Sequence, residues 1–323
     1  MKALRTVVSC AVFLSIGVNL VSPIHAFHEG GHHLIAVMAF DELSDERHSE
    51  LLSLLKSHPF YSQDFTPPAG IRDINAWRIG RAGYWADVAR AYEDFNRPTW
   101  HYQLGATLAI GQVSVPRDPV DAPGGASLQT QELHVVQAIG LCRRVLWDAT
   151  APKRDRALAL CWLCHLVADI HQPCHAGSLY VAGLFPEGDR GANWIGTVQG
   201  ENMHALWDSL LGKQFDEGDL SRRREKITRV HQNELPTAAV LREGANQPML
   251  IVKECRRLAR LRVYDAEVLK AIRSAPRNEP EFRLRIKLSD NYLKAAGRAA
   301  QLQALLAAKR LAIILSEPPP ERN

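Results

Sequence analysis

Histidine and aspartate side chains stand at helical spacing in the segment LCWLCHLVADIHQPCH (160–175). His165 and Asp169 are four residues apart, so a helix would present both side chains on one face, about one turn apart. Pro173 would end that helix, because proline disrupts the backbone of a helix interior. His175 would then lie in the turn just beyond the helix, close to the other two side chains.

The same spacing recurs in the segment ENMHALWDSLL (201–211), where His204 and Asp208 are again four residues apart. One such pair alone is more often a hydrogen-bonded pair on a helix surface. Both pairs here stand among leucine, valine, isoleucine and tryptophan, and polar side chains buried there without partners would cost several kcal/mol. Metal ligation satisfies several such groups at once, and imidazole nitrogen and carboxylate oxygen suit zinc. The two pairs, together with His175, predict a zinc site.

The N-terminus has the layout of a secretory signal peptide. Lys2 and Arg5 precede an apolar run over 6–21, and the segment SPIHA ends at Ala26, a small residue of the kind found at cleavage sites. An uncleaved membrane anchor is the alternative, but the run is short for a membrane span and contains serine and asparagine. We therefore expect cleavage after Ala26 and export to the periplasm or the extracellular space, without stable insertion in a membrane.

Composition leaves room for one or two domains and gives no strong charge. The chain has 323 residues, of which 46% are hydrophobic, and no internal repeat or composition shift marks a second domain. Removal of residues 1–26 takes away Lys2 and Arg5 but no acidic residue, so the formal net charge falls from +4 to +2. A nearly neutral protein has no long-range field that would recruit nucleic acid. Contacts with phosphate would therefore depend on local charges or metal ions.

Cysteine usage leaves the pairing open. Five of the six cysteines remain after cleavage behind Ala26, so at least one thiol is free or forms an intermolecular bond. Cys161 and Cys164 have the spacing of a redox or thiolate pair, but the helical pattern around them favours buried, unreactive thiols. A bridge between Cys142 and Cys255 is compatible with the sequence.

Most of the chain has the apolar rhythm of helices that bury one face, and no stretch shows the alternation of a half-buried strand. Helices are expected over 43–55, 128–147, 152–170, 220–230, 247–272 and 281–315, with loops over 59–70, 105–125 and 176–200. No segment after the signal peptide is expected to cross a membrane. We predict an all-α protein with a single multi-helix domain over 27–323.

Further stretches offer side chains for the same chemistry. After cleavage, Phe27 would present an α-amine that can chelate a metal together with its own carbonyl, and His32 lies within reach. The motif WAD supplies the carboxylate of Asp87, and Arg90 follows three residues later with a fixed positive charge. His101 is an imidazole between two aromatic residues. Alone, each of these residues would be ordinary core or surface chemistry.

The ordered set of motifs resembles the S1/P1 nuclease family of secreted, zinc-dependent, all-helical enzymes. The resemblance covers nearly the whole mature chain. It comprises Phe27 with His32, the WAD motif with Asp87 and Arg90, His101, the motif H-x-x-x-D-x-H-Q-P-x-H with His165, Asp169 and His175, the GDRGAN stretch over 188–193, and HALWD with His204 and Asp208. It implies a fold of the phospholipase C/P1 nuclease type.

The resemblance also implies a site for three zinc ions. The first would be held by Asp87, His101, His165 and Asp169, the second by His175, His204 and Asp208, and the third by the amine and carbonyl of Phe27 with His32 and Asp169. Clustered zinc ions acidify water, bind phosphate oxygens and stabilise a departing alkoxide, so Asp87 and Asp169 would serve catalysis as well as metal binding. Arg90 would neutralise charge that builds up in the transition state.

The implied reaction is hydrolysis of the P–O3′ bond in single-stranded DNA or RNA, which leaves 5′-phosphate ends, with 3′-nucleotidase activity as well. Phe27 stands where the best-known members have tryptophan, but chelation by the backbone needs no indole. Tyr102 can stack on a base, which is worth about 1–3 kcal/mol. Leu104 stands where the family pattern has an acid, so we expect retained chemistry with an altered base preference.

Two other functions fit part of the pattern. A zinc-dependent phospholipase C shares the implied fold and much of the ligand set, although the WAD and HQPxH motifs favour the nuclease. A non-catalytic protein that binds zinc or scavenges nucleotides would keep the ligands and lose the reaction positions, and Leu104 is the one position that points that way.

Overall fold

The computed structural model describes residues 27–279 and 281–320, so the expected signal peptide over 1–26 lies outside the described residues. The described part of the chain is built mainly of α-helices, as predicted. They are α1 (Glu29–Phe40), α2 (Asp45–Leu55), α3 (Tyr61–Asp64), α4 (Ile74–Val88), α5 (Val135–Trp147), α6 (Lys153–His171), α7 (Met203–Ser209), α8 (Glu217–His231), α9 (Ala238–Asn246), α10 (Pro248–Leu258), α11 (Ala266–Ser274) and α12 (Asp290–Ser316).

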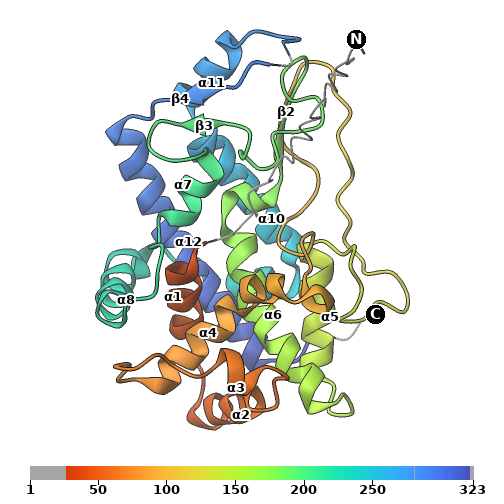
Figure 1. Cartoon of the computed structure of the whole chain (residues 1–323), viewed down its shortest axis with the longest axis vertical. Coiled ribbons are helices and arrows are strands. Elements are labelled where there is room, and N and C mark those ends of the chain that lie inside the picture. The colour runs from red at the N-terminus through yellow and green to blue at the C-terminus, as the bar shows by residue number, and fades with distance from the viewer. Residues whose placement is uncertain (1–26, 280, 321–323) are drawn as a thin grey trace, which may run out of the picture.

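Helix α6 forms the centre of the larger core (Figure 1). Its residues from Ala157 to His171 are all buried, and it contacts α1, α4, α5 and α12. Its leucine, alanine, cysteine and tryptophan side chains pack against apolar side chains of these neighbours. Because α6 is covered on all sides, His165 and Asp169 are fixed in the protein interior rather than on a surface.

A second, smaller core joins α7, α11 and the first turns of α12, which lie towards the top of Figure 1. A third cluster lies where α1 and α6 meet α12, and it contains Phe27, Ala168 and Leu211. Helix α12 contributes to all three clusters. It therefore connects the segment that carries Asp208 with the bundle that carries Asp169.

The described part of the chain also contains two short pairs of parallel strands, which no alternation in the sequence indicated and which leave the all-α class unchanged. Strand β1 (Ala106–Ile110) pairs with β2 (Ser178–Val181), and β3 (Gly196–Thr197) pairs with β4 (Arg285–Ile286). Three of these strands lie in stretches predicted as loops. Each strand is short and pairs with a distant part of the chain, which a local pattern does not reveal.

Three helices were predicted too broadly. Helix α5 begins only at Val135, after a capping box that Gln137 completes. The stretch 247–272 divides into α10 and α11 around a π turn, and Asp265 caps the second helix by accepting a hydrogen bond from a backbone N–H. Helix α12 begins after Ser289, which caps it in the same way.

Helix α12 is long and apolar enough to cross a membrane, contrary to the expectation from the sequence. It is the one helix in the described part of the chain that has this length and composition. However, 67% of its apolar window is buried inside the protein. The apolar surface of α12 is thus used for internal packing, as in other core helices.

All five cysteines among the described residues are free and buried. The bridge between Cys142 and Cys255 that the sequence allowed is therefore not formed. Burial raises the pKa of the Cys164 thiol to about 12 and that of Cys161 well above its usual range. This agrees with the interpretation of Cys161 and Cys164 as unreactive core residues.

Candidate metal centre

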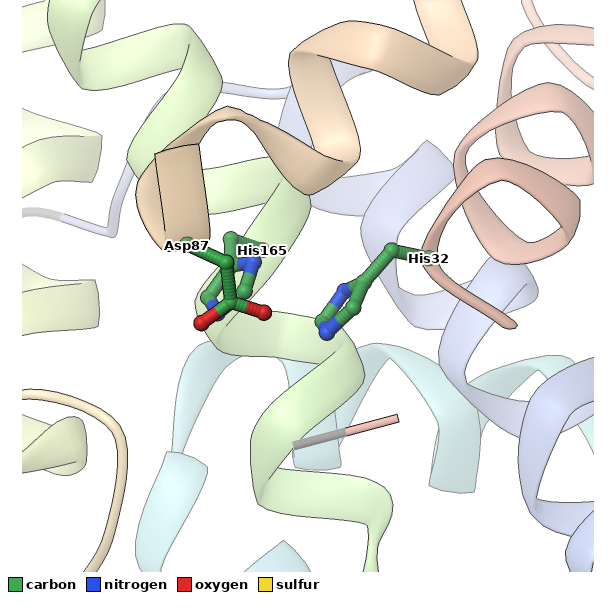
Figure 2. Close-up of side chains that lie close together, drawn as sticks. All are labelled: His32, Asp87 and His165. Atoms are coloured by element: carbon green, nitrogen blue, oxygen red, sulfur yellow. The ribbon is translucent and has the colours of Figure 1, made fainter. Parts of the chain in front are cut away.

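Eight of the predicted ligand side chains are buried and close together. They come from α1, α4, α6, α7, the turn at 101 and the 3₁₀ turn η3 (Pro173–Ala176). They form three groups, in each of which all ligand atoms lie within 4.8 Å of one another: His32, Asp87 and His165; His101, His165 and Asp169; and His175, His204 and Asp208. Figure 2 shows the first group converging from α1, α4 and α6.

Asp169 lies between three imidazoles. Its Oδ2 is 2.9 Å from Nδ1 of His101 and 3.2 Å from Nε2 of His165, while its Oδ1 is 3.4 Å from Nε2 of His32. The carboxylate is fully buried. Its two oxygens face different histidines, so this one side chain could bridge two cations.

Close packing of α1, α4 and α6 positions the first group. The ring of His32 stacks on that of His165, with 4.0 Å between centroids and 10° between planes. Nδ1 of His165 donates to the carbonyl oxygen of Gly83 at 2.9 Å. A Cβ at Gly83 would lie 2.8 Å from the carbonyl oxygen of His32, so glycine is what allows α1 and α4 to approach this closely. Nε of Arg90 donates to Oδ1 of Asp87 at 2.8 Å and orients that carboxylate.

His175 and His204 face each other, with their Nε2 atoms 3.0 Å apart. Nδ1 of His175 donates to the carbonyl oxygen of His101 at 2.5 Å, and Nδ1 of His204 donates to that of Gly191 at 2.7 Å. A carbonyl oxygen only accepts, so in each neutral ring Nδ1 carries the proton and Nε2 carries a lone pair. Two lone pairs directed at each other repel, and a cation between them removes the repulsion.

Zinc fits this set of donors. Zinc–nitrogen bonds of about 2.0–2.1 Å in a tetrahedral site place neighbouring ligand atoms about 3.3 Å apart. The ring nitrogens of His101 and His165 lie 2.9 and 3.2 Å from Asp169, and that of His204 lies 3.5 Å from Asp208. Both nitrogens of His32, Nε2 of His101 and Oδ1 of Asp169 are buried without a hydrogen-bond partner among the described residues. Such atoms are costly to bury. Bound cations would satisfy Oδ1 of Asp169, Nε2 of His101 and one nitrogen of His32, because a neutral imidazole has a single lone pair.

Burial also sets the protonation of the ligands. It lowers the pKa of His101 to about 4 and lowers the pKa of His32 and of His175, so these rings stay neutral near pH 7 and keep a lone pair for a metal. Burial raises the pKa of Asp208 well above its usual range. For Asp169, burial by itself would raise the pKa. The neighbouring imidazoles of His165 and His101 outweigh this effect and hold the pKa below its usual range. A bound cation would favour the ionised form of both carboxylates.

The match to a known family covers this whole arrangement. The family model of the S1/P1 nucleases matches residues 27–318, which contain every predicted ligand position. The chain belongs to the S1/P1 nuclease family. It is therefore a nuclease, in a family that depends on zinc and is generally secreted. No individual curated protein matches the chain.

Phe27, the first residue expected in the mature nuclease, lies next to the metal centre. Its ring is fully buried against Ala168 and Leu211, which are close in sequence to the ligands on α6 and α7. The backbone N–H of His28 donates to the carbonyl oxygen of Asp208 at 3.1 Å. Phenylalanine thus serves as an apolar anchor for the N-terminal backbone beside these ligands.

The residues predicted to contact substrate lie around the ligands. Arg90 reaches the centre through Asp87, and its Nη2 is buried without a hydrogen bond to any described residue. Tyr102 is partly buried and meets the ring of His134 edge-on, at 5.4 Å between centroids. Leu104 contributes its carbonyl oxygen, which accepts a hydrogen bond from Arg256.

Gln172 is a residue of the nuclease centre that the sequence analysis did not single out. Its Nε2 donates to Oδ1 of Asp208 at 2.7 Å, and its Oε1 accepts from the backbone N–H of Cys174 at 2.6 Å. The second hydrogen bond fixes the orientation of the amide, so that Nε2 must face Asp208. Its position in the sequence between Asp169 and His175, inside the motif H-x-x-x-D-x-H-Q-P-x-H, could have indicated this role.

Proposed function

We propose that this nuclease is an exported three-zinc phosphodiesterase that hydrolyses the P–O3′ bond of single-stranded DNA or RNA. It would leave 5′-phosphate ends and also remove phosphate from 3′-nucleotides. The observation that supports this best is the set of imidazole nitrogens and carboxylate oxygens that face one another at 2.9–3.5 Å. The catalytic domain would span 27–323 after removal of residues 1–26.

The side chains and the N-terminal backbone would hold the ions in three adjoining places. The ligands would be Asp87, His101, His165 and Asp169 for one ion, His175, His204 and Asp208 for another, and Phe27, His32 and Asp169 for the third. When bound, the ions supply charge that acidifies water and stabilises the attacking and leaving oxygens. The carbonyl partners of His165, His175 and His204 hold each ring with Nε2 directed into the centre.

Arg90 would bind the phosphate beside Asp87. Its Nε is held by that carboxylate, which leaves Nη2 as a donor without a described partner. A charge-assisted hydrogen bond from this nitrogen would strengthen as charge builds up on the phosphate oxygens. Cys164 and Cys174 are buried with raised pKa values, so neither thiol is suited to act as a nucleophile.

Tyr102 would stack on a substrate base next to the centre. Leu104 offers no side-chain acceptor for the base edge, and its carbonyl is already held by Arg256. Stacking tolerates any base, because every base has a π face. The expected result is cleavage with weak or altered base preference.

The first test is a timed incubation of the mature, zinc-loaded protein with single-stranded DNA, with chelator-treated protein as the control. Zinc-dependent appearance of 5′-phosphorylated products, and phosphate release from a 3′-nucleotide, are expected. A protein with three bound zinc ions that leaves both substrates intact would refute the proposal. Release of phosphocholine from lecithin by the same protein would then identify a phospholipase C.

A second test addresses the N-terminus. Protein that begins at Phe27 is compared with protein that carries one extra residue before it, which moves the free amine away from the third ion. Metal analysis should give three zinc ions per chain for the first protein and two for the second. Three tightly bound ions in both proteins would contradict the role of the Phe27 amine.

A further inference from the structure

Tyr84 lies at the edge of the metal centre and is outside the proposed ligand set. It precedes Asp87 by three residues, about one turn of α4, and its ring centroid is 6.3 Å from that of His32. The ring is partly exposed. Burial, followed by the carboxylates of Asp87 and Glu29, raises the pKa of its hydroxyl to about 12. Tyr84 is thus a neutral aromatic surface beside the ligands.

Arg81 adds a positive charge next to this ring. Its guanidinium carbon is 5.8 Å from the centroid of Tyr84 and 6.0 Å from that of Trp77, and its Nε donates to the carbonyl oxygen of Asp64 at 3.0 Å. Within the described part of the chain, two rings and a carbonyl hold this side chain, and no carboxylate neutralises it. Its position is therefore fixed while its charge stays available.

Tyr84 lies at one end of a row of imidazoles, and Tyr102 lies elsewhere, with its ring against that of His134. The ring of His165 is 4.0 Å from that of His32 and 4.8 Å from that of His101. Tyr84 neighbours His32, whereas Tyr102 follows His101 in the chain. Because the two tyrosine rings have different neighbours, one strand whose scissile phosphate lies over the predicted ligands could use a different ring for the nucleotide on each side.

We propose that Tyr84 and Arg81 form a second nucleotide subsite, in which Tyr84 stacks on the base and Arg81 binds the phosphate of the nucleotide across the scissile bond from Tyr102. This inference rests on the proposed function. Base stacking on an aromatic ring is tolerant of sequence, and Arg81 supplies a local positive charge in a chain whose net charge gives no long-range field. A 3′-mononucleotide fills only the Tyr102 side, so the second subsite favours oligonucleotides over mononucleotides.

Arg78 provides a matched control on the same helix. Its Nε donates to the carbonyl oxygen of Phe65 at 3.3 Å, and its guanidinium carbon is 5.5 Å from the ring centroid of Tyr61. Its contacts therefore resemble those of Arg81. It precedes Asp87 by nine residues, which is about 180° around the helix, so it faces away from the metal centre.

The test compares zinc-loaded wild type with Tyr84→Ala, Tyr84→Phe, Arg81→Gln and Arg78→Gln, on a 3′-mononucleotide and on a short oligothymidylate. Tyr84→Ala should lower the ratio of kcat/KM for the oligonucleotide to that for the mononucleotide by about 5- to 150-fold. Tyr84→Phe keeps the aromatic ring and should have the ratio of wild type. Arg81→Gln should flatten the dependence of log KM for the oligonucleotide on log salt by about 0.7, and Arg78→Gln should leave that slope as in wild type.

Zinc content, measured on every variant, separates the outcomes. An unchanged ratio in Tyr84→Ala together with an unchanged salt slope in Arg81→Gln would overturn the subsite. Equal loss on both substrates with fewer bound zinc ions would also overturn it, because Tyr84 would then only support the metal centre. Wild-type protein that hydrolyses neither substrate would instead overturn the proposed function on which the subsite rests.

Discussion

Replacement of Gln172 by leucine tests how the protein interior fixes one metal ligand. Asp208 is 1% exposed, and its Oδ1 accepts the hydrogen bond from Nε2 of Gln172 at 2.7 Å. Its Oδ2 is left 3.5 Å from Nε2 of His204. Gln172 thus holds one carboxylate oxygen while the other faces the proposed metal position. Leucine has a similar size and removes only the hydrogen bonds.

The size of the effect follows from this geometry. A hydrogen bond to a buried charged group contributes about 1.5–3 kcal/mol, which corresponds to about 10- to 100-fold in an equilibrium constant. Loss of an outer partner of a metal ligand changes metal affinity by the same factor, about 10- to 100-fold. We therefore expect Gln172→Leu to weaken the binding of one of the three proposed zinc ions by this factor and to leave the binding of the other two unchanged.

The assay is competition with a chelator of known zinc affinity, followed by metal analysis, with Gln137→Leu as the matched control. Gln137 also accepts from a backbone N–H at a helix start, that of His134, and donates to a carbonyl oxygen, that of Asp121. It contacts no predicted ligand, so Gln137→Leu should lose about 1 kcal/mol of stability and keep the zinc affinity of wild type, while only Gln172→Leu releases a zinc ion. Identical zinc affinities in the two variants would refute the reasoning.

Three further predictions concern the ligand centre, the helix packing and the pH dependence. Asp169→Asn should abolish nearly all cleavage of single-stranded DNA, because that carboxylate faces three imidazoles; near-normal turnover would contradict its central place. Gly80→Ala should cost about 1–3 kcal/mol, because the new Cβ would lie 2.2 Å from Nδ1 of His33. Gly297→Ala, where nothing lies within 4 Å of the new Cβ, should instead raise the free energy of unfolding by about 0.5–1 kcal/mol. Urea midpoints that move in the same direction for the two variants would refute this contrast. Burial lowers the pKa of His58 to about 3, below its unfolded value of about 6.5. Between these values only the unfolded chain binds the proton, so this residue's contribution to stability falls by about 1.4 kcal/mol per unit as pH decreases. His58→Asn should therefore flatten the loss of stability between pH 6 and pH 4 in denaturant titrations, and an unchanged slope would contradict the assignment.

The spacing of the paired histidine and aspartate side chains was predictable because each pair lies on a single helix. Helical geometry fixes the separation of His165 from Asp169 and of His204 from Asp208, whatever the rest of the chain does. Helix α6 also ends just before Pro173, as proline requires. For the same reason, the order of the motifs was sufficient to predict the family that the match over residues 27–318 confirms.

The short strands, the start of α5 and the break before α11 were not predicted. Strand β1 exists through its pairing with β2, which is about 70 residues away in the chain. The break before α11 depends on the π turn and on the cap that Asp265 provides. These features depend on contacts between segments or on a choice between competing caps, and periodicity within one segment does not encode either.

The sequence by itself determined which residue types are available for the proposed chemistry and which of them share a helix. The tertiary structure alone decided which atoms meet. The carbonyls of Gly83 and Gly191 set the tautomers of His165 and His204, Gln172 selects one oxygen of Asp208, and Tyr84 lies beside His32. The physical reason is that hydrogen bonds and ring contacts act over about 3–6 Å, so they form only after packing has brought distant segments together.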